Sequence, residues 1–275
     1  YYPNGPNQGI GHNATIIFIH GGAWWMGWRG MDTKELEYLA SQGYVCFDID
    51  YRLFDVKMLN AQAESGPNMV QGILQYTSGP AYLTGPYTIG DMVKDIGNFT
   101  YFISAPGNNK YGADLTKVVL LGQSAGSYLA GIVGYGYNNP WFGANFSTAL
   151  TIKGMILHYP PNNASQFFYY DHPMFHSDTF SIIPGTPDTN PDAYYHYTPS
   201  NLVDSNCPPT LILQGAVDKM VPPENAYTIY TQLINHDRKA IELVAPFGGH
   251  AFDFAPHYQA ISIYYTERFL YLILN

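Results

Sequence analysis

The pentapeptide Gly-Gln-Ser-Ala-Gly at positions 122–126 places a hydroxyl nucleophile, Ser124, among small residues. It follows the apolar run 118–121, which predicts a buried strand, and it precedes a helix-competent segment from Ser127 to Ile132. A sharp turn from strand to helix, with small neighbours around an exposed serine, is typical of a nucleophile elbow. The alternative interpretation of Ser124 is a cap on an ordinary strand-to-helix turn.

A serine attacks well only when a base removes its proton and an acid orients that base. Asp218 lies in the loop directly after the apolar run 210–214, and His250 lies in a glycine-rich loop after the run 241–244. Because parallel strands end at one edge of a sheet, these loops are expected to meet Ser124 there. We therefore predict His250 as the base and Asp218 as the acid. A turn or helix cap is the alternative role for Asp218.

Acyl transfer also needs backbone N–H groups directed at the charge of the tetrahedral intermediate. The segment His-Gly-Gly-Ala-Trp at positions 20–24 follows an apolar run and fits this requirement through Gly22 and Ala23, and Ala125 supplies a further donor. Trp24 and Gln123 are predicted to contact substrate. The alternative for segment 20–24 is a turn that only ends a strand.

The elements that must position these residues follow from apolar runs and helical patterns along the chain. Strands are predicted at 14–19, 44–50, 117–121, 152–159, 210–214 and 241–244, and helices at 31–41, 91–104, 127–132, 224–234 and mostly over 251–274. Strands that alternate with helices indicate one α/β domain over 1–275, with a mainly parallel sheet covered on both faces.

Two long segments do not fit simple connections, and we interpret both as cap insertions: about 54–90, with a short helix near 69–76, and about 162–200. The second is rich in aromatic residues at 167–170. Together with Trp25, Trp28 and Phe54, these could line an apolar cleft, although core packing is an equal interpretation of each.

Composition excludes several classes of protein. Of 275 residues only 12% are charged and the net charge is -9, which argues against a nucleic-acid partner. No run reaches the roughly eighteen apolar residues of a membrane span. Cys46 and Cys207 are predicted to be buried free thiols, and no Cys and His spacing indicates zinc, so we expect no metal and no other cofactor.

The low charge and the 25 tyrosines favour an extracytoplasmic or secreted protein that tolerates acid, because little charge pairing is lost when carboxylates are protonated. A cytoplasmic protein with an unusual composition is the alternative. The sequence leaves a homodimer open.

Together with Asp-Tyr-Arg-Leu at positions 50–53, these motifs resemble the α/β-hydrolase superfamily, and within it serine carboxylesterases with an HGG-type oxyanion loop. The chain is similar to hormone-sensitive-lipase-like esterases and to the branch of acetylxylan and feruloyl esterases and kynurenine formamidases. The resemblance implies an eight-stranded, mostly parallel sheet and metal-free acyl transfer to water through an acyl-enzyme. Ala23 stands where the lipase-like loop has a third glycine.

We therefore expect a serine hydrolase that cleaves carboxylic esters through an acyl-enzyme on Ser124, with small-acyl or aromatic esters favoured. The alternatives are an amide-cleaving relative, such as a formamidase or peptidase, and a non-catalytic binding module on the same fold.

Overall fold

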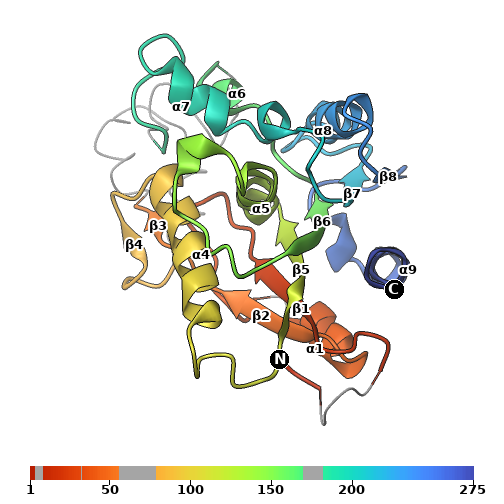
Figure 1. Ribbon diagram of the computed structural model, residues 1–275. Coiled ribbons are helices and arrows are strands. Elements are labelled where there is room, and N and C mark those ends of the chain that lie inside the picture. The colour runs from red at the N-terminus through yellow and green to blue at the C-terminus, as the bar shows by residue number, and fades with distance from the viewer. Residues whose placement is uncertain (4–8, 32, 56–78, 170–181) are drawn as a thin grey trace.

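The structure is a computed structural model that describes residues 1–3, 9–31, 33–55, 79–169 and 182–275 (Figure 1). Its strands are β1 (Ala14–Ile19), β2 (Val45–Ile49), β3 (Leu53–Phe54), β4 (Thr84–Gly85), β5 (Asp114–Gln123), β6 (Ile152–His158), β7 (Thr210–Gly215) and β8 (Ala240–Ala245). Its α-helices are α1 (Thr33–Ser41), α4 (Ile89–Ser104), α5 (Ala125–Gly136), α6 (Ala164–Tyr169), α7 (Pro191–His196), α8 (Glu224–Asn235) and α9 (Pro256–Leu274). Short 3-10 helices are η1 (Pro140–Phe142), η2 (Pro199–Leu202) and η3 (Phe252–Phe254).

The central sheet has the strand order β2-β1-β5-β6-β7-β8, and every pairing in it is parallel. This confirms the mainly parallel sheet predicted from the sequence. The expected number of eight strands is not met in the described part of the chain, where the central sheet has six and the short strands β3 and β4 form a separate pair.

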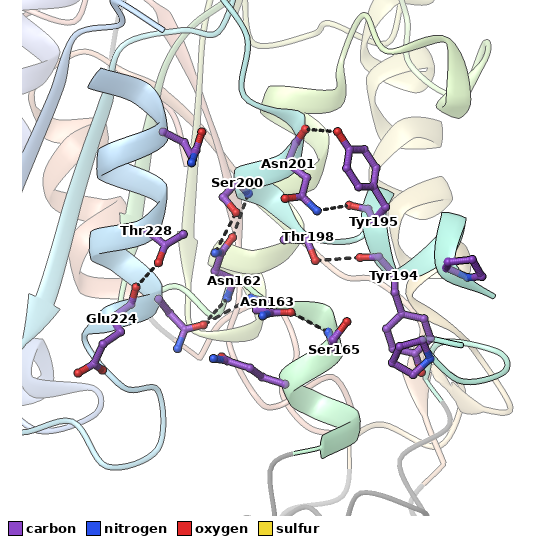
Figure 2. A pocket seen from close by; sticks show the side chains of 15 residues that line it. Asn162, Asn163, Ser165, Tyr194, Tyr195, Thr198, Ser200, Asn201, Glu224 and Thr228 are labelled. Carbon is purple, nitrogen blue, oxygen red and sulfur yellow. Dashed lines mark hydrogen bonds between the residues drawn. The ribbon is translucent and has the colours of Figure 1, made fainter. Parts of the chain in front are cut away.

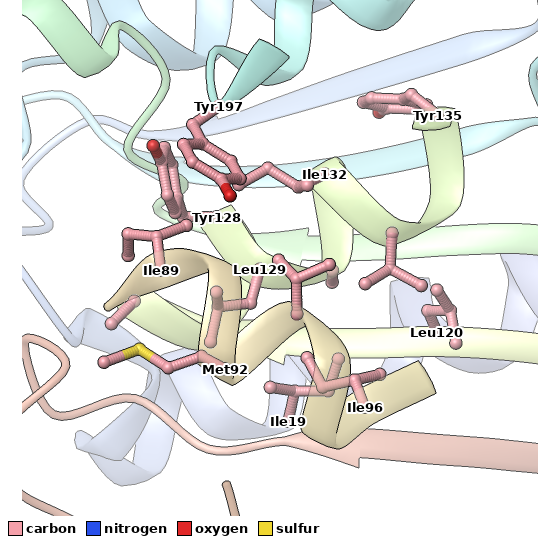
Figure 3. Close-up of a cluster of buried hydrophobic side chains, with 14 of the residues drawn as sticks. Ile19, Ile89, Met92, Ile96, Leu120, Tyr128, Leu129, Ile132, Tyr135 and Tyr197 are labelled. Atoms are coloured by element: carbon pink, nitrogen blue, oxygen red, sulfur yellow. The ribbon is translucent and has the colours of Figure 1, made fainter. Parts of the chain in front are cut away.

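Helices cover both faces of the sheet, as the alternation of the strand residues requires. Ile17 and Ile19 of β1 face the cluster formed with α4, α5 and α8, whereas Ile16 and Phe18 face the cluster formed with α1 and α9. Figure 3 shows the first cluster, in which side chains of α4 and α5 interleave above β1 and β5. The inner strands are therefore covered on both sides, with β1 and β7 buried along their whole length, whereas the edge strand β8 is partly exposed. The carboxyl edge of the sheet carries the loops.

The helix after Ser124 differs most from its predicted length, since α5 runs over Ala125–Gly136 rather than ending at Ile132. Every residue of α5 is buried. Its glycines lie where neighbours approach closely: a Cβ at Gly131 would lie 3.0 Å from Pro199, and one at Gly134 would overlap Met155. Tertiary packing has thus extended a helix that glycine would weaken in isolation.

The two predicted cap segments are described only in part. Of the first, the structure describes β4 and the residues around it, and the helix predicted near 69–76 lies outside the described residues. Of the second, it describes α6, α7 and η2. The predicted aromatic cluster at 167–170 falls at the end of α6, and its side chains lie outside the described part.

Candidate active site

Ser124 lies at the turn between β5 and α5, with φ of 51° and ψ of -119°. Its backbone N–H donates a hydrogen bond of 2.9 Å to the carbonyl of His158, the last residue of β6. A Cβ at Gly126 would overlap the carbonyl of Ile19, so only glycine lets α5 start this close to β1. The sheet and the glycine together impose the left-handed backbone of the serine.

The three predicted catalytic residues lie together at the carboxyl edge of the sheet. The Oγ of Ser124 is 2.9 Å from Nε2 of His250, and Nδ1 of His250 is 2.8 Å from Oδ2 of Asp218. Asp218 is fixed in turn, since its Oδ1 accepts the N–H groups of Met220 at 2.8 Å and Val221 at 2.9 Å. A carboxylate at Nδ1 favours the tautomer with the proton there, which leaves Nε2 free to accept the serine proton.

Three residues missed by the sequence analysis support this arrangement. Asp253 of η3, three residues after His250, accepts a hydrogen bond of 2.7 Å from Nδ1 of His158, and both side chains are buried. Tyr159 presents its ring to that of His250, with the centroids 4.7 Å apart and the planes at 62°. No motif surrounds any of the three residues, so only the topology could reveal them.

The pKa of Asp253 lies below its usual value. Burial by itself raises this pKa, but the hydrogen bond and the charge of His158, together with hydrogen bonds from the Tyr159 side chain and the backbone, outweigh burial. The ion pair therefore ties the loop that carries His250 to the strand end that accepts the Ser124 N–H.

The predicted oxyanion loop passes close to the serine. A Cβ at Gly21 would lie 3.0 Å from the carbonyl of Gln123 and 3.4 Å from Cβ of Ser124. Gly22 and Ala23 have φ of 123° and 51°, a left-handed run that glycine begins without strain. Ala125 is the first residue of α5, so its N–H has no partner within the helix.

His20 fixes the start of this loop. Its ring stacks on Tyr51, with centroids 4.4 Å apart and planes at 14°, and the Tyr51 hydroxyl donates to the His20 carbonyl at 2.9 Å. Nδ1 of His20 is 2.7 Å from the carbonyl of Gly21. Burial lowers the pKa of His20, so the ring is held as the neutral form.

A pocket of about 210 Å³ opens at Ser124 and His250. Both predicted glycine-loop donors, Gly22 and Ala23, line it together with Gln123. The rest of the wall is mostly apolar. Its large side chains, three of them methionines, are those of Phe18, Met26, Met31, Tyr159, Met220 and Phe254.

Trp24, predicted to contact substrate, does not line this pocket. Its side chain is buried and its ring packs edge-on against Tyr128 at 5.4 Å, with the backbone in the left-handed region at φ of 68°. Trp25 and Phe54 are likewise buried in the core, and Trp28 is exposed on the surface. The core interpretation is therefore the one that the structure shows for Trp24, Trp25 and Phe54.

Cys46 and Cys207 are buried free thiols, as predicted. Among the residues that the structure describes, no His, Cys, Asp and Glu side chains gather in a set that could hold a metal ion. Within the same part of the chain, no helix combines the length and the apolar character that crossing a bilayer requires.

Known proteins share this fold and sequence pattern. The chain is 25% identical over 252 residues to esterase LipC of Mycobacterium tuberculosis and 26% identical over 253 residues to the probable carboxylic ester hydrolase LipM of the same species. The alignments cover 87% and 90% of this chain but 53% and 52% of the relatives, so the chain spans about half their length.

Among solved structures, the chain is similar to a thermophilic esterase of Thermogutta terrifontis, Est2, in a butyrate-bound form. The TM-score is 0.68 at 18% sequence identity, covering 98% of this chain and 86% of that one. This likeness establishes the α/β-hydrolase fold.

The sequence model of the family described as BD-FAE matches residues 4–75 and 83–233. These ranges include the oxyanion loop, Ser124 and Asp218, and they make up most of the chain. The chain therefore belongs to the BD-FAE family of α/β-hydrolase esterases.

Proposed function

We propose that this chain is a serine carboxylesterase that hydrolyses esters with small acyl groups through an acyl-enzyme on Ser124. The observation that carries the proposal is the continuous hydrogen-bonded series from Ser124 through His250 to Asp218, with distances of 2.9 and 2.8 Å. A serine that served only as a helix cap would bond the backbone of α5, and Ser124 makes no such side-chain bond.

In the first half-reaction, Nε2 of His250 removes the Ser124 proton while Oγ attacks the ester carbonyl carbon. The tetrahedral intermediate collapses when its bond to the leaving oxygen breaks and His250 donates the proton to the departing alcohol. In the second half, His250 removes a proton from water, and the hydroxide attacks the acyl carbon. The bond to Oγ then breaks, Ser124 recovers its proton and the carboxylic acid leaves.

Asp218 stabilises the imidazolium that forms twice in each cycle. Its own charge is held by the two backbone N–H groups that Oδ1 accepts, and its side chain is fully buried. The oxygen charge of each intermediate is assigned to the N–H groups of Gly22, Ala23 and Ala125. Donors of this kind are fixed by the backbone before the substrate arrives, so they need not reorganise during the reaction.

The size and lining of the pocket support small acyl groups. Its volume of about 210 Å³ falls below the roughly 300–1,000 Å³ of sites that hold drug-sized ligands. Its wall carries no Lys or Arg among the described residues, so a charged acyl group would find no counter-ion. The structurally similar Thermogutta esterase was solved with butyrate bound, and butyrate is a carboxylate with a small acyl chain.

Covalent labelling with a fluorophosphonate tests the proposal directly. We expect one adduct, located on Ser124 by mass spectrometry. The rate of p-nitrophenyl acetate hydrolysis should fall by several orders of magnitude in Ser124→Ala. Ser41→Ala, a change at an exposed helix end, is the matched control and should keep full activity. Undiminished hydrolysis by Ser124→Ala would disprove the proposal.

Matched ester and anilide substrates with the same acyl group separate an esterase from an amide-cleaving relative. The ester should be cleaved far faster, because an anilide leaves only when His250 protonates its nitrogen. Equal rates would favour the amidase.

A further inference from the structure

A second pocket, of about 470 Å³, lies between the segment after β6, the helix pair α7 and η2, and α8 (Figure 2). It shares no lining residue with the pocket at Ser124. Its volume lies in the range of sites that hold small ligands. The esterase reaction proposed above makes no use of it.

Buried polar side chains build the frame of this pocket. The amide of Asn162 bonds Ser200 twice, donating to its hydroxyl at 3.0 Å and accepting its N–H at 2.9 Å. Asn225 accepts the N–H of Asn162 at 3.1 Å. Thr198 accepts the N–H of Ala164 at 3.1 Å. Because these groups are buried and bonded, the wall is already ordered before any ligand enters.

Other polar side chains on the wall keep donors or acceptors that no described residue bonds. The side chain of Asn163 accepts the N–H of Ser165 at 2.9 Å, which leaves its NH₂ group free. The Ser165 hydroxyl and the amides of Gln166 and Gln232 make no side-chain hydrogen bond. Figure 2 shows Asn163 and Ser165 on the segment after β6, where the backbone N–H of Asn163 lies 3.5 Å from Oδ1 of Asn225 at the start of α8. Amides and a hydroxyl offer both donors and acceptors to a ligand.

The charge of the lining selects the class of ligand. No Lys, Arg or His is among the described lining residues, and Glu224 is the one charged side chain there. An anionic ligand would therefore meet a carboxylate and no counter-charge. The rings of Pro187, Pro191 and Tyr194 supply apolar surface beside the amides. Neutral sugars present hydroxyls that donate and accept, together with C–H faces that pack on such rings.

We propose that this pocket binds a neutral oligosaccharide at a site separate from Ser124. The proposal does not depend on the esterase activity, because binding needs neither Ser124 nor His250. A sugar bound here would hold the chain on a carbohydrate while small esters react in the other pocket.

Isothermal titration calorimetry with xylohexaose, cellohexaose and mannohexaose tests the proposal. At least one of these should bind with 1:1 stoichiometry, and a galacturonate hexamer, which is anionic, should not. The double variant Gln166→Ala/Gln232→Ala should weaken binding about tenfold or more, since each lost amide bond contributes on the order of 1 kcal/mol. Gln259→Ala on α9, which lines neither pocket, is the matched control and should bind normally.

The Ser124→Ala variant should bind the sugar as the wild type does, which separates this proposal from the esterase proposal. Saturating sugar should leave the KM for p-nitrophenyl acetate unchanged. The inference is wrong if none of the three hexaoses binds at about 10 mM, if the double variant binds as tightly as the wild type, or if the sugar competes with the small ester.

Discussion

The buried ion pair of Asp253 and His158 gives the most direct test of how the site is held. The exposed fractions of the two side chains are 7% and 0%, and Nδ1 and Oδ2 are 2.7 Å apart. The substitution Asp253→Asn keeps the size of the side chain and one hydrogen bond to His158, but removes the charge. It therefore isolates the electrostatic part of the contact between the His250 loop and β6.

The expected cost follows from the kind of hydrogen bond. Bonds to charged groups contribute about 1.5–3 kcal/mol and neutral bonds about 0.5–1.5 kcal/mol, so Asp253→Asn should lower the free energy of unfolding by about 1–2 kcal/mol at pH 7. Because the pKa of Asp253 is lower in the folded than in the unfolded chain, its ionised form stabilises the fold above its unfolded pKa of about 4. This contribution is lost as the pH falls through the folded pKa.

Urea unfolding, followed by tryptophan fluorescence, should therefore show two results. The variant should be less stable than the wild type at pH 7, and the difference should narrow below about pH 4. Asp237→Asn, at an exposed turn, serves as the control. Its free energy of unfolding should match that of the wild type both at pH 7 and below about pH 4. A difference below about 0.5 kcal/mol at pH 7, or one that stays constant into acid, would refute the reasoning.

Three further predictions concern the elbow, the triad and the thiols. Gly126→Ala should cost about 1–3 kcal/mol of stability in urea unfolding, because its Cβ overlaps a carbonyl of β1, whereas Gly249→Ala, where a Cβ meets open space, should stay within about 0.5 kcal/mol. Asp218→Asn should lower kcat by on the order of 10⁴-fold in the p-nitrophenyl acetate assay, because an amide no longer fixes the imidazole tautomer. Burial raises the pKa of Cys46 and of Cys207 to about 12, so iodoacetamide should modify neither thiol at pH 8 until urea unfolds the chain, as mass spectrometry would show.

The strands of the sheet could be predicted because each contains a short apolar run. β1 and β7 are buried along their whole length, whereas the edge strand β8 is partly exposed. The run 14–19 matches β1 at both ends, and 210–214 falls one residue short of β7. The catalytic residues followed from the same runs: in a parallel sheet, a loop after any strand reaches the carboxyl edge, so Ser124, Asp218 and His250 could be placed together before their distances were known.

Side-chain direction could not be predicted in the same way. Trp24 directly follows the oxyanion residues Gly22 and Ala23. Its backbone is left-handed, however, and its ring packs against Tyr128 in the interior. The position of Trp24 next to this loop in the sequence therefore does not predict the direction of its side chain. His158 and Asp253 are 95 residues apart and carry no motif, so their pairing depends on β6 and η3 meeting in the fold.

The strain at the nucleophile shows why the fold, rather than the serine itself, sets the position of the hydroxyl. Ser124 and Tyr159 follow adjacent strands, and both have positive φ, at 51° and 41°, which costs a non-glycine residue about 1–3 kcal/mol each. Each is held by one backbone bond that continues the sheet: Ser124 N–H to the carbonyl of His158 at 2.9 Å, and Tyr159 N–H to that of Leu213 at 2.7 Å. Neither bond involves the serine side chain. The elbow should therefore persist when the hydroxyl is removed, so that lost activity in Ser124→Ala reports on the chemistry and not on the fold.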